Sequence, residues 1–260
     1  MNSNNLLVEV REKTLWLSLN RPERLNSLTL EMLSNLRLAL VEFKSDPAVS
    51  SIVIRGIGPK AFCSGMDLSS SKGDESVFDS PHGLPVLGEL FVDMWGYPKP
   101  IVAMVHGFAL AGGFGLASAC DLVICSNDAV FGTPEVNVGL WPYVISVPLL
   151  RVLKPRMLLD LMMTGRTINA KQALELDIVN EVVELDELEG AVLDKLNVLN
   201  SKSTAVLGHG KQAFYESLDM SSTDSLKYLS DRLQRALLLE DFQEGRKAFA
   251  EKRPPEWKNC

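Results

Sequence analysis

The residue of this chain with the strongest potential to move a proton is Glu135, a carboxylate in a loop punctuated by proline and glycine. The loop runs from Gly132 to Pro142, and Glu135 is its one acidic residue among mostly apolar neighbours. Burial disfavours the charged form of a carboxyl group, so the pKa would rise towards neutrality and suit acid–base catalysis. A solvated glutamate on a surface turn is the alternative interpretation.

A glycine-rich turn precedes this acid. The apolar run Ile101–Val105 follows Pro100 and predicts a buried strand. After it, adjacent glycines are followed by small residues, and we expect a helix to open at Gly112. The first amides of a helix have no intrahelical partner and lie at the positive end of the helix dipole, so such a turn favours negative charge.

A second turn, in the segment Lys60 to Leu68, could supply further N–H donors. Its centre is Ser64-Gly65, and glycine permits a backbone bend that brings amides close to a ligand. Two such turns beside an acid indicate a binding site that favours negative charge.

The elements that must position these residues follow from hydrophobic periodicity and turn signals. The N-terminal half predicts an antiparallel hairpin (Leu6–Val10, Thr14–Leu19), a helix from N-cap Thr29 to about Ser45, a strand (Val49–Ile54), a mobile loop (Ser69–Ser80), a helix (Leu84–Trp95) and a strand (Asp121–Cys125). The rest predicts helices over 143–153, 156–164, 170–176, 186–200, 203–218 and 222–250, with a break at Gly165 and a short strand near Val182.

Composition bounds the class of protein. The 260 residues are 46% hydrophobic and 23% charged, which is typical of a globular protein with one main domain. The mixture of predicted strands and helices makes it an α/β protein. A net charge of −7 disfavours nucleic-acid or membrane-surface partners, since both need a basic surface. The polar N-terminus and the lack of a long apolar run predict a cytoplasmic protein. The four cysteines have no metal-ligand spacing, so we expect no metal: Cys63, Cys120, Cys125 and Cys260.

Five motifs in order along nearly the whole chain carry a resemblance to one family. They are Asn20-Arg21-Pro22 with Asn26, the block Ala61–Leu68, the turn Val105–Gly115, Phe131-Gly132-Thr133-Pro134-Glu135, and the ending Phe249–Arg253. With these motifs the chain resembles the crotonase superfamily of enoyl-CoA hydratase/isomerase proteins.

The resemblance implies a fold, an assembly and a substrate. The fold is a spiral of ββα turns over residues 1–195, followed by a helical region over 196–260 that forms trimers or hexamers. The substrate is an acyl-CoA thioester, and coenzyme A belongs to the substrate, so no separate cofactor is expected. The family's two oxyanion-hole amides correspond to Met66 and Gly112, and they stabilise the enolate that forms when an α-proton leaves.

The catalytic acids depart from the hydratase pattern. A hydratase of this family carries one glutamate on the helix after the glycine turn and a second in the Pro-Glu loop. Here Glu135 matches the second, but Gly115 occupies the first position. One acid favours a double-bond isomerase, in which Glu135 removes a proton from one carbon and returns it to another. A hydratase, decarboxylase or dehydratase with a replacement acid stays open. Glu89 and Asp93 are candidates for that acid, but a solvated surface position is the favoured interpretation of both.

The remaining candidate residues would bind the substrate. Leu140 and Trp141 would line the acyl pocket, Phe249 and Lys252 would reach the nucleotide end of CoA from a neighbouring subunit, and Arg24 would meet a phosphate. The full set is Arg24, Ala61, Gly65, Asp67, Leu68, Gly113, Gly115, Pro134, Leu140, Trp141, Phe249 and Lys252.

Some residues near these motifs are expected to be structural, and some other functions are disfavoured. Asp67 and Asp121 also have a structural interpretation, and His106 is expected to pack rather than react. A CoA-binding protein without catalysis is the rival from another class. RNA binding is disfavoured by charge, and a serine hydrolase is disfavoured because no nucleophile elbow accompanies His82, His106 or His209.

Overall fold

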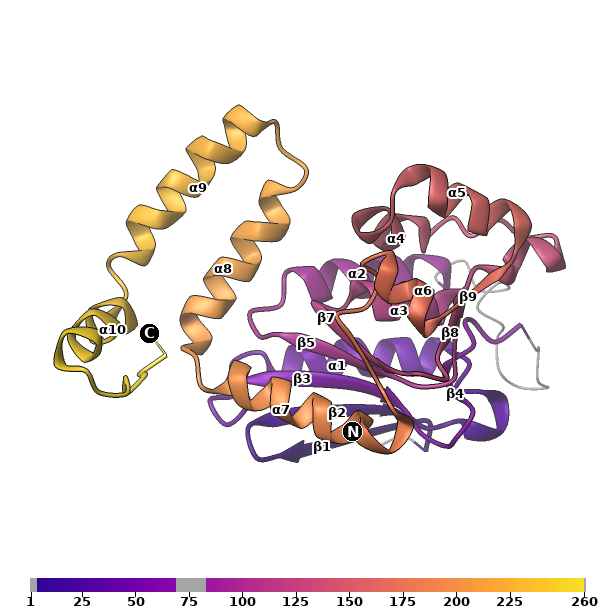
Figure 1. The fold of residues 1–260 in the computed structure, drawn as a ribbon, viewed down its shortest axis with the longest axis horizontal. Coiled ribbons are helices and arrows are strands. Elements are labelled where there is room, and N and C mark those ends of the chain that lie inside the picture. The colour runs from indigo at the N-terminus through magenta and orange to yellow at the C-terminus, as the bar shows by residue number, and fades with distance from the viewer. Residues whose placement is uncertain (1–3, 69–82, 260) are drawn as a thin grey trace.

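The computed structural model describes residues 4–68 and 83–259. Figure 1 shows a layered α/β core and an arm of C-terminal helices that projects from it. The expected mobile loop Ser69–Ser80 lies outside the described residues.

The larger sheet forms the base of the core and, within the described residues, contains six strands in the order β1-β2-β3-β5-β7-β10. Their bounds are β1 Leu6–Arg11, β2 Thr14–Leu19, β3 Ser51–Gly56, β5 Ile101–Val105, β7 Leu122–Ser126 and β10 Glu181–Val183. The expected β1–β2 hairpin is confirmed as antiparallel, and the other neighbours pair in parallel. The apolar runs of β3, β5 and β7 reflect burial, because helices cover parallel strands on both faces.

A second sheet stacks short strands beside the first. Its described order is β4-β6-β8-β9, with bounds β4 Ala61–Cys63, β6 Phe108–Leu110, β8 Val130–Gly132 and β9 Thr167–Asn169. The strand pairs β3 and β4, β5 and β6, and β7 and β8 each place one strand in either sheet, which produces a stepwise ββα spiral. Sequence patterning does not predict these strands, since three residues are too few for alternation to be recognised.

Helices cover both faces of the larger sheet. Those of the core are α1 Leu30–Phe43, α2 Gly83–Trp95, α3 Gly112–Ala119, α4 Ser146–Val152, α5 Pro155–Thr164, α6 Ala170–Glu175 and α7 Leu188–Asn200. Short 3₁₀ turns lie at Pro22–Arg24, Pro134–Val138 and Leu185–Glu187. The predicted cap is confirmed, since the Met32 amide donates to the Thr29 hydroxyl at 3.2 Å. On the opposite face, Leu188, Val192 and Leu196 of α7 pack against Trp16 and Val53.

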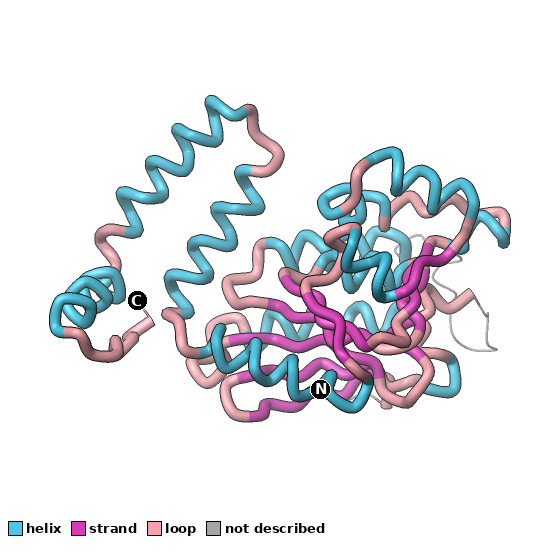
Figure 2. Tube along the Cα trace, viewed as in Figure 1, coloured by secondary structure: helices cyan, strands magenta, loops and turns pink. Residues whose placement is uncertain are grey.

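The C-terminal region consists of α8 Thr204–Ser217, α9 Ser222–Ala236 and α10 Glu240–Glu251, and it contains no strand (Figure 2). The prediction of one continuous helix over 222–250 was wrong, because the helix is interrupted at Leu237–Leu239. There Leu239 is extended, and the Gln243 side chain donates to the Leu237 carbonyl at 3.0 Å. The apolar spacing continues across the break, so periodicity did not reveal it. The division proposed at residue 196 falls within α7, and the chain leaves the core after Asn200.

A buried carboxylate attaches the arm to the core. Asp121 accepts hydrogen bonds from the Ile101 amide at 2.7 Å and the Tyr215 hydroxyl at 3.0 Å, and it pairs with Lys211 at 2.7 Å. Lys211 and Tyr215 belong to α8, whereas Ile101 begins β5. The structural interpretation of Asp121 is therefore confirmed. No helix among those described has both the length and the apolar character needed to span a membrane.

Candidate active site

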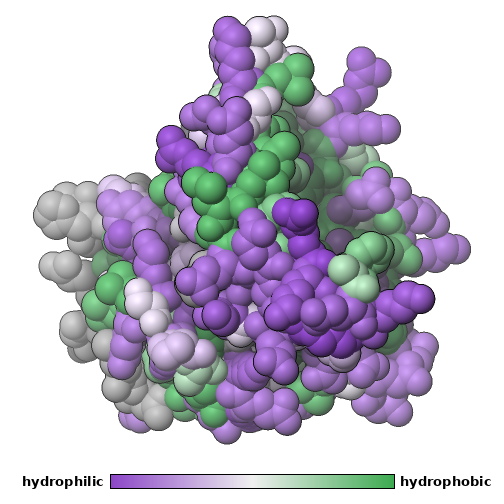
Figure 3. Space-filling model, turned by 90° about the vertical axis from the view of Figure 1, so that its left-hand side faces the viewer, coloured by the Kyte–Doolittle hydropathy of each residue, from purple (hydrophilic) through white to green (hydrophobic). Residues whose placement is uncertain are grey.

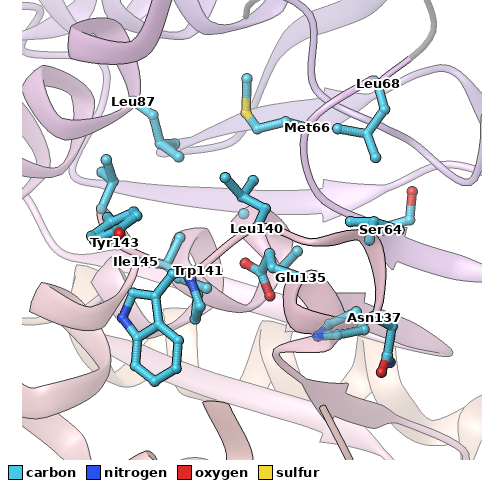
Figure 4. Close-up of a pocket in the computed structure, with 16 residues that line it drawn as sticks. Ser64, Met66, Leu68, Leu87, Glu135, Asn137, Leu140, Trp141, Tyr143 and Ile145 are labelled. Carbon is cyan, nitrogen blue, oxygen red and sulfur yellow. The ribbon is translucent and has the colours of Figure 1, made fainter. Parts of the chain in front are cut away.

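A cavity of about 400 Å³ opens between α2, the start of α3 and the segment from Pro134 to Ile145. Figure 4 shows Leu87, Met66 and Leu68 on one side and Glu135, Leu140 and Ile145 on the other. The lining is mostly apolar and comprises Ser64, Met66, Leu68, Leu87, Ala111, Gly112, Pro134, Glu135, Asn137, Val138, Leu140, Trp141, Pro142, Tyr143, Val144 and Ile145.

Glu135 supplies the acidic group of this cavity. It lies in the first turn of the 3₁₀ segment Pro134–Val138, directly after β8, and its Oε2 atom is buried with no hydrogen-bond partner among the described residues. Desolvation raises the pKa of Glu135 from 4.5 to about 7, and a backbone hydrogen bond of the same residue opposes the rise. The alternative of a solvated surface glutamate is therefore wrong, and this carboxyl can both accept and donate a proton near neutral pH.

The predicted glycine turn lies beside it. Helix α3 begins at Gly112 as expected, and its N-cap residue Ala111 has φ 50°, a backbone conformation that L-residues adopt rarely. The Ala111 amide donates to the Gly132 carbonyl at 2.9 Å, which ties the turn to β8. The Gly112 amide then heads the helix, where no intrahelical acceptor exists for it.

The second turn meets the first. Gly65 has φ +104°, and a Cβ atom there would lie 2.7 Å from the Cβ of Ala111 and 3.2 Å from the Gly112 amide nitrogen. A Cβ at Gly112 would in turn lie 3.5 Å from the Met66 nitrogen. The two bends therefore converge, and Met66 and Gly112 line the same cavity as Glu135. This arrangement is suited to an oxygen that becomes negatively charged.

Hydrophobic side chains occupy the space beside Gly115. A Cβ atom there would lie 2.6 Å from Cγ2 of Ile145 and 3.2 Å from Cζ of Phe91. Within the described residues Glu135 is the only aspartate or glutamate lining the cavity. Among the parts of the chain that the structure describes, no carboxylate replaces the acid missing at this position.

The two candidate replacements lie on the outer surface of α2. Asp93 pairs with Arg37 of α1 at 2.6 Å, and Glu89 pairs with the same guanidinium. Their side chains are 37% and 51% exposed, respectively. These carboxylates connect two helices, and the interpretation as solvated surface acids is confirmed.

The other sequence-derived candidates divide into three groups. Leu68, Pro134, Leu140 and Trp141 line the cavity as expected. Buried or half-buried residues behind its wall are Ala61, Gly65, Asp67, Gly113 and Gly115. Away from the cavity lie Arg24, exposed on the 3₁₀ turn, and Phe249 and Lys252, exposed at the end of α10.

The residues behind the wall have identifiable packing roles. A Cβ at Gly113 would lie 2.2 Å from the Cys63 carbonyl oxygen, so glycine allows α3 to approach β4 closely. Asp67 pairs with Arg21 at 2.8 Å. His106, expected to be structural, has its Nε2 atom 2.7 Å from the Gly58 carbonyl oxygen.

Sequence reasoning missed much of the apolar wall. Leu87, Tyr143, Val144 and Ile145 line the cavity, but apolar residues in a helix or loop carry no local signal that separates a pocket from a core. They face the cavity because α2 and the segment 142–145 lie on opposite sides of it. Sequence periodicity does not predict this arrangement.

No group of three or more potential metal ligands occurs within the described part of the chain.

Comparison with known proteins agrees with this geometry. A solved structure from Mycobacterium smegmatis, titled as an enoyl-CoA hydratase, superposes with a TM-score of 0.92 at 29% identity and covers 98% of this chain and 99% of its own. The fold and cavity thus define a crotonase-type acyl-CoA enzyme.

Sequence comparison gives the family. A model described as "Enoyl-CoA hydratase/isomerase" matches residues 9–260. A short-chain-enoyl-CoA hydratase of Clostridium acetobutylicum is 31% identical over 255 residues and covers 97% of both chains. A carnitinyl-CoA dehydratase of Proteus mirabilis is 31% identical over 263 residues, covering 98% of this chain and 99% of the relative. The chain belongs to the enoyl-CoA hydratase/isomerase family.

Proposed function

We propose that this enzyme moves a carbon–carbon double bond within an enoyl-CoA thioester. The observation that carries the proposal is the apolar filling beside Gly115, where Ile145 and Phe91 lie. Hydration needs one group to activate water and a group to protonate the α-carbon, and the described cavity supplies a single carboxyl group. Isomerisation needs one group that acts twice.

The proposed reaction uses Glu135 in both steps. The carboxylate removes a proton from the α-carbon of a 3-enoyl thioester, and the electron pair delocalises onto the thioester oxygen. The amides of Met66 and Gly112 would stabilise this oxyanion, with an effect of about 3–4 kcal/mol per donor. The protonated Glu135 then returns its proton to the γ-carbon, which yields the 2-enoyl thioester. A pKa of about 7 suits a group that must accept and then donate.

The apolar wall favours an unsubstituted acyl chain. Leu87, Leu140 and Ile145 offer no hydrogen bond to a substrate, and Glu135 is the one charged residue in the described lining. A polar or cationic acyl group that lies against these three side chains would lose its water without compensation. We therefore infer an acyl group that carries no functional group other than the double bond.

Incubation of the purified protein with 3-hexenoyl-CoA and, separately, with 2-hexenoyl-CoA tests the proposal. We expect interconversion of the two and no hydroxyacyl-CoA, as measured by chromatography of the CoA esters. The Glu135→Gln variant keeps the shape of the side chain and should lose at least about a hundredfold in kcat. Formation of 3-hydroxyhexanoyl-CoA would instead identify a hydratase.

A panel of malonyl- and hydroxyacyl-CoA esters extends this test to the other lyases of the family. Turnover of one of these esters without isomerisation would contradict the proposal. Tight acyl-CoA binding without turnover of any ester would identify a catalytically silent binding protein.

We further propose that the enzyme forms homotrimers, alone or paired into hexamers, through its helical arm. Helix α9 buries none of its residues within the described chain, and apolar side chains 38–69% exposed follow one face of α8 and α9: Phe214, Leu218, Leu226, Leu229, Leu233 and Leu237. Figure 3 shows apolar side chains gathered in a hollow on the side of the molecule that bears the arm. Exposed apolar faces of this kind support association.

The arm also explains how CoA would be held. Phe249 is 87% exposed at the end of α10, which Figure 1 places at the far end of the molecule from α4 and α5. We propose that Phe249 and Lys252 of one subunit contact the nucleotide end of CoA bound to its neighbour, and that Arg24 meets a phosphate. The cytoplasmic location stays a prediction from sequence.

A further inference from the structure

We propose that Arg21, Asn26 and Asp67 act as positioning residues that hold the Met66 amide in place for the thioester oxygen. The inference rests on the proposed function, because it concerns one of the two amides assigned to the oxyanion. It gives a role to the motif Asn20-Arg21-Pro22 with Asn26, which lies outside the cavity lining.

The turn that carries Met66 is held by a neighbouring segment of chain. Leu28 and Met66 form an isolated parallel bridge, in which the Leu28 amide donates to the Gly65 carbonyl at 2.7 Å and the Asp67 amide donates to the Leu28 carbonyl at 2.9 Å. The Ser64 amide donates to the Leu25 carbonyl at 3.0 Å. These bonds use the Ser64 and Asp67 amides, and the Gly65 amide donates to the Cys63 sulfur at 3.4 Å. Among the described residues, this leaves the Met66 amide for the cavity.

Asn26 fixes this neighbouring segment to the sheet. It is fully buried, and its side-chain amide donates to the Ile57 carbonyl at 2.9 Å and the Ala61 carbonyl at 2.7 Å. Its Oδ1 atom accepts from the Arg21 amide at 2.9 Å. Asn26 has φ 54°, a conformation that asparagine tolerates better than most residues. The side chain thus connects the segment to both ends of the β3–β4 connection.

Arg21 joins the two sides of the bridge. One guanidinium nitrogen donates to the Ser27 carbonyl at 2.8 Å and to the Ser27 hydroxyl at 3.0 Å, and the same nitrogen lies 2.8 Å from the Asp67 carboxylate. Both charged side chains are 15% exposed. Charge-assisted hydrogen bonds of this kind are strong and directional. They therefore restrain both strands of the bridge, one at Ser27 and the other at Asp67.

These contacts should restrain the position of the Met66 amide relative to the thioester oxygen. A hydrogen bond to an oxyanion depends on its donor lying about 3 Å from the oxygen, and a displacement of about 1 Å in an active site can cost about a hundredfold in rate. Loosening the Arg21–Asp67 pair should therefore impair catalysis, although neither side chain touches the cavity.

The test measures the polarisation of the thioester carbonyl directly. Hexanoyl-CoA labelled with ¹³C at its carbonyl has no double bond to move, and isotope-edited infrared difference spectra report its carbonyl stretch when bound. In the wild-type enzyme we expect a shift to lower frequency. The variants are Asp67→Asn, which keeps the side-chain size, Arg21→Met, and Arg21→Lys, which keeps the charge and should be intermediate.

Asp67→Asn and Arg21→Met should return the carbonyl frequency most of the way to its solution value. We also expect kcat for 3-hexenoyl-CoA to fall about 10- to 100-fold with KM changed less than about threefold. The matched control is Arg11→Met, because Arg11 pairs with Glu9 at 2.8 Å on β1 and takes no part in this bridge; it should keep both the shift and kcat.

The outcomes separate this inference from the proposed function. A wild-type shift that persists in both Asp67→Asn and Arg21→Met would overturn the positioning role alone, even if those variants melt at lower temperature. Bound hexanoyl-CoA without any shift in the wild-type enzyme would show that no oxyanion hole forms, and it would overturn the proposed function together with this inference.

Discussion

The chemistry of this enzyme depends on the surroundings of two side-chain positions, 135 and 115. Glu135 has a pKa raised by desolvation, and Gly115 faces Ile145 and Phe91. The first position retains a proton carrier, and the second is filled with hydrocarbon that cannot activate water. Under the proposed function, the difference between moving a double bond and hydrating it rests on a few apolar atoms.

The raised pKa of Glu135 predicts a pH dependence of stability. The group titrates near 4.5 when unfolded and about 7 when folded, so between these values the folded protein keeps a proton that the unfolded chain has lost. Stability from this group is therefore lost as pH rises through that window. Consider the unfolding free energy of Glu135→Gln minus that of the wild type. This difference should be about 1–3 kcal/mol larger above pH 7 than below pH 4.5.

Denaturant titrations at pH 4, 6 and 8 measure this difference, and comparison across pH cancels the constant cost of the substitution. A difference between the two proteins that does not change with pH would contradict the assigned titration. In the same window, kcat/KM of the wild-type enzyme should rise with pH and level off above about 7, since the first step needs the carboxylate.

Restoring a glutamate at position 115 should fail unless space is made for it. A Cβ there would lie 2.6 Å from Cγ2 of Ile145, so Gly115→Glu should cost about 1–3 kcal/mol through overpacking. The double variant Gly115→Glu/Ile145→Ala removes Cγ2 of residue 145 but keeps its Cβ, which lies 2.9 Å from a Cβ at position 115. It should therefore recover part of that stability and gain hydration of 2-hexenoyl-CoA. Thermal unfolding and product analysis measure the two effects, with Ile145→Ala as control. Hydration by the single variant would show that Ile145 is not the obstacle.

Much of this site could be predicted at residue scale because its chemistry is encoded locally. Glu135 differs in kind from its neighbours, and adjacent glycines identify Gly112. Ile145 and Leu87 could not be found, since an apolar residue on a cavity wall has the same sequence signature as one in a core. Their role depends on contacts between segments far apart in the chain.

At the scale of elements, the helices and strands with a long repeating apolar pattern could be predicted, and the short ones could not. Helix α1 with its Thr29 cap and the β1–β2 hairpin are confirmed. The strands of the second sheet contain three residues each and have no pattern of their own; pairing with neighbours determines them. At the break between α9 and α10 the Gln243 side chain donates to the Leu237 carbonyl. Apolar periodicity does not reveal a hydrogen bond of this kind.

A buried ion pair contributes to the attachment of α8 to the core. Lys211 lies 2.7 Å from Asp121, and their side chains are 10% and 17% exposed. Lys211→Met would leave a buried carboxylate without its cation, which typically costs about 3–5 kcal/mol. Denaturant unfolding should show this loss. The control Arg235→Met removes an exposed ion pair on α9 and should cost less than about 1 kcal/mol; equal losses would contradict the special importance of Asp121.

At the scale of the molecule, the proposed assembly gives the arm a task of its own, the association of subunits. The exposed leucines of α9 predict that Leu226→Gln/Leu233→Gln reduces the particle mass from that of a trimer or hexamer towards the 28.6 kDa of one chain. Light scattering after size exclusion measures the mass, and the exposed-surface substitution Lys227→Gln on the same helix is the control. An unchanged mass in the double variant would place the contact elsewhere.

Phe249 and Lys252 lie away from the cavity of their own chain, which predicts that two inactive variants can complement each other. If each site combines the pocket of one subunit with the tail of the next, a Glu135→Gln chain and a Lys252→Ala chain carry complementary defects. Random co-assembly in equal amounts would then rebuild an intact site at about a quarter of all positions. Two inactive alleles expressed together would restore activity that neither produces alone.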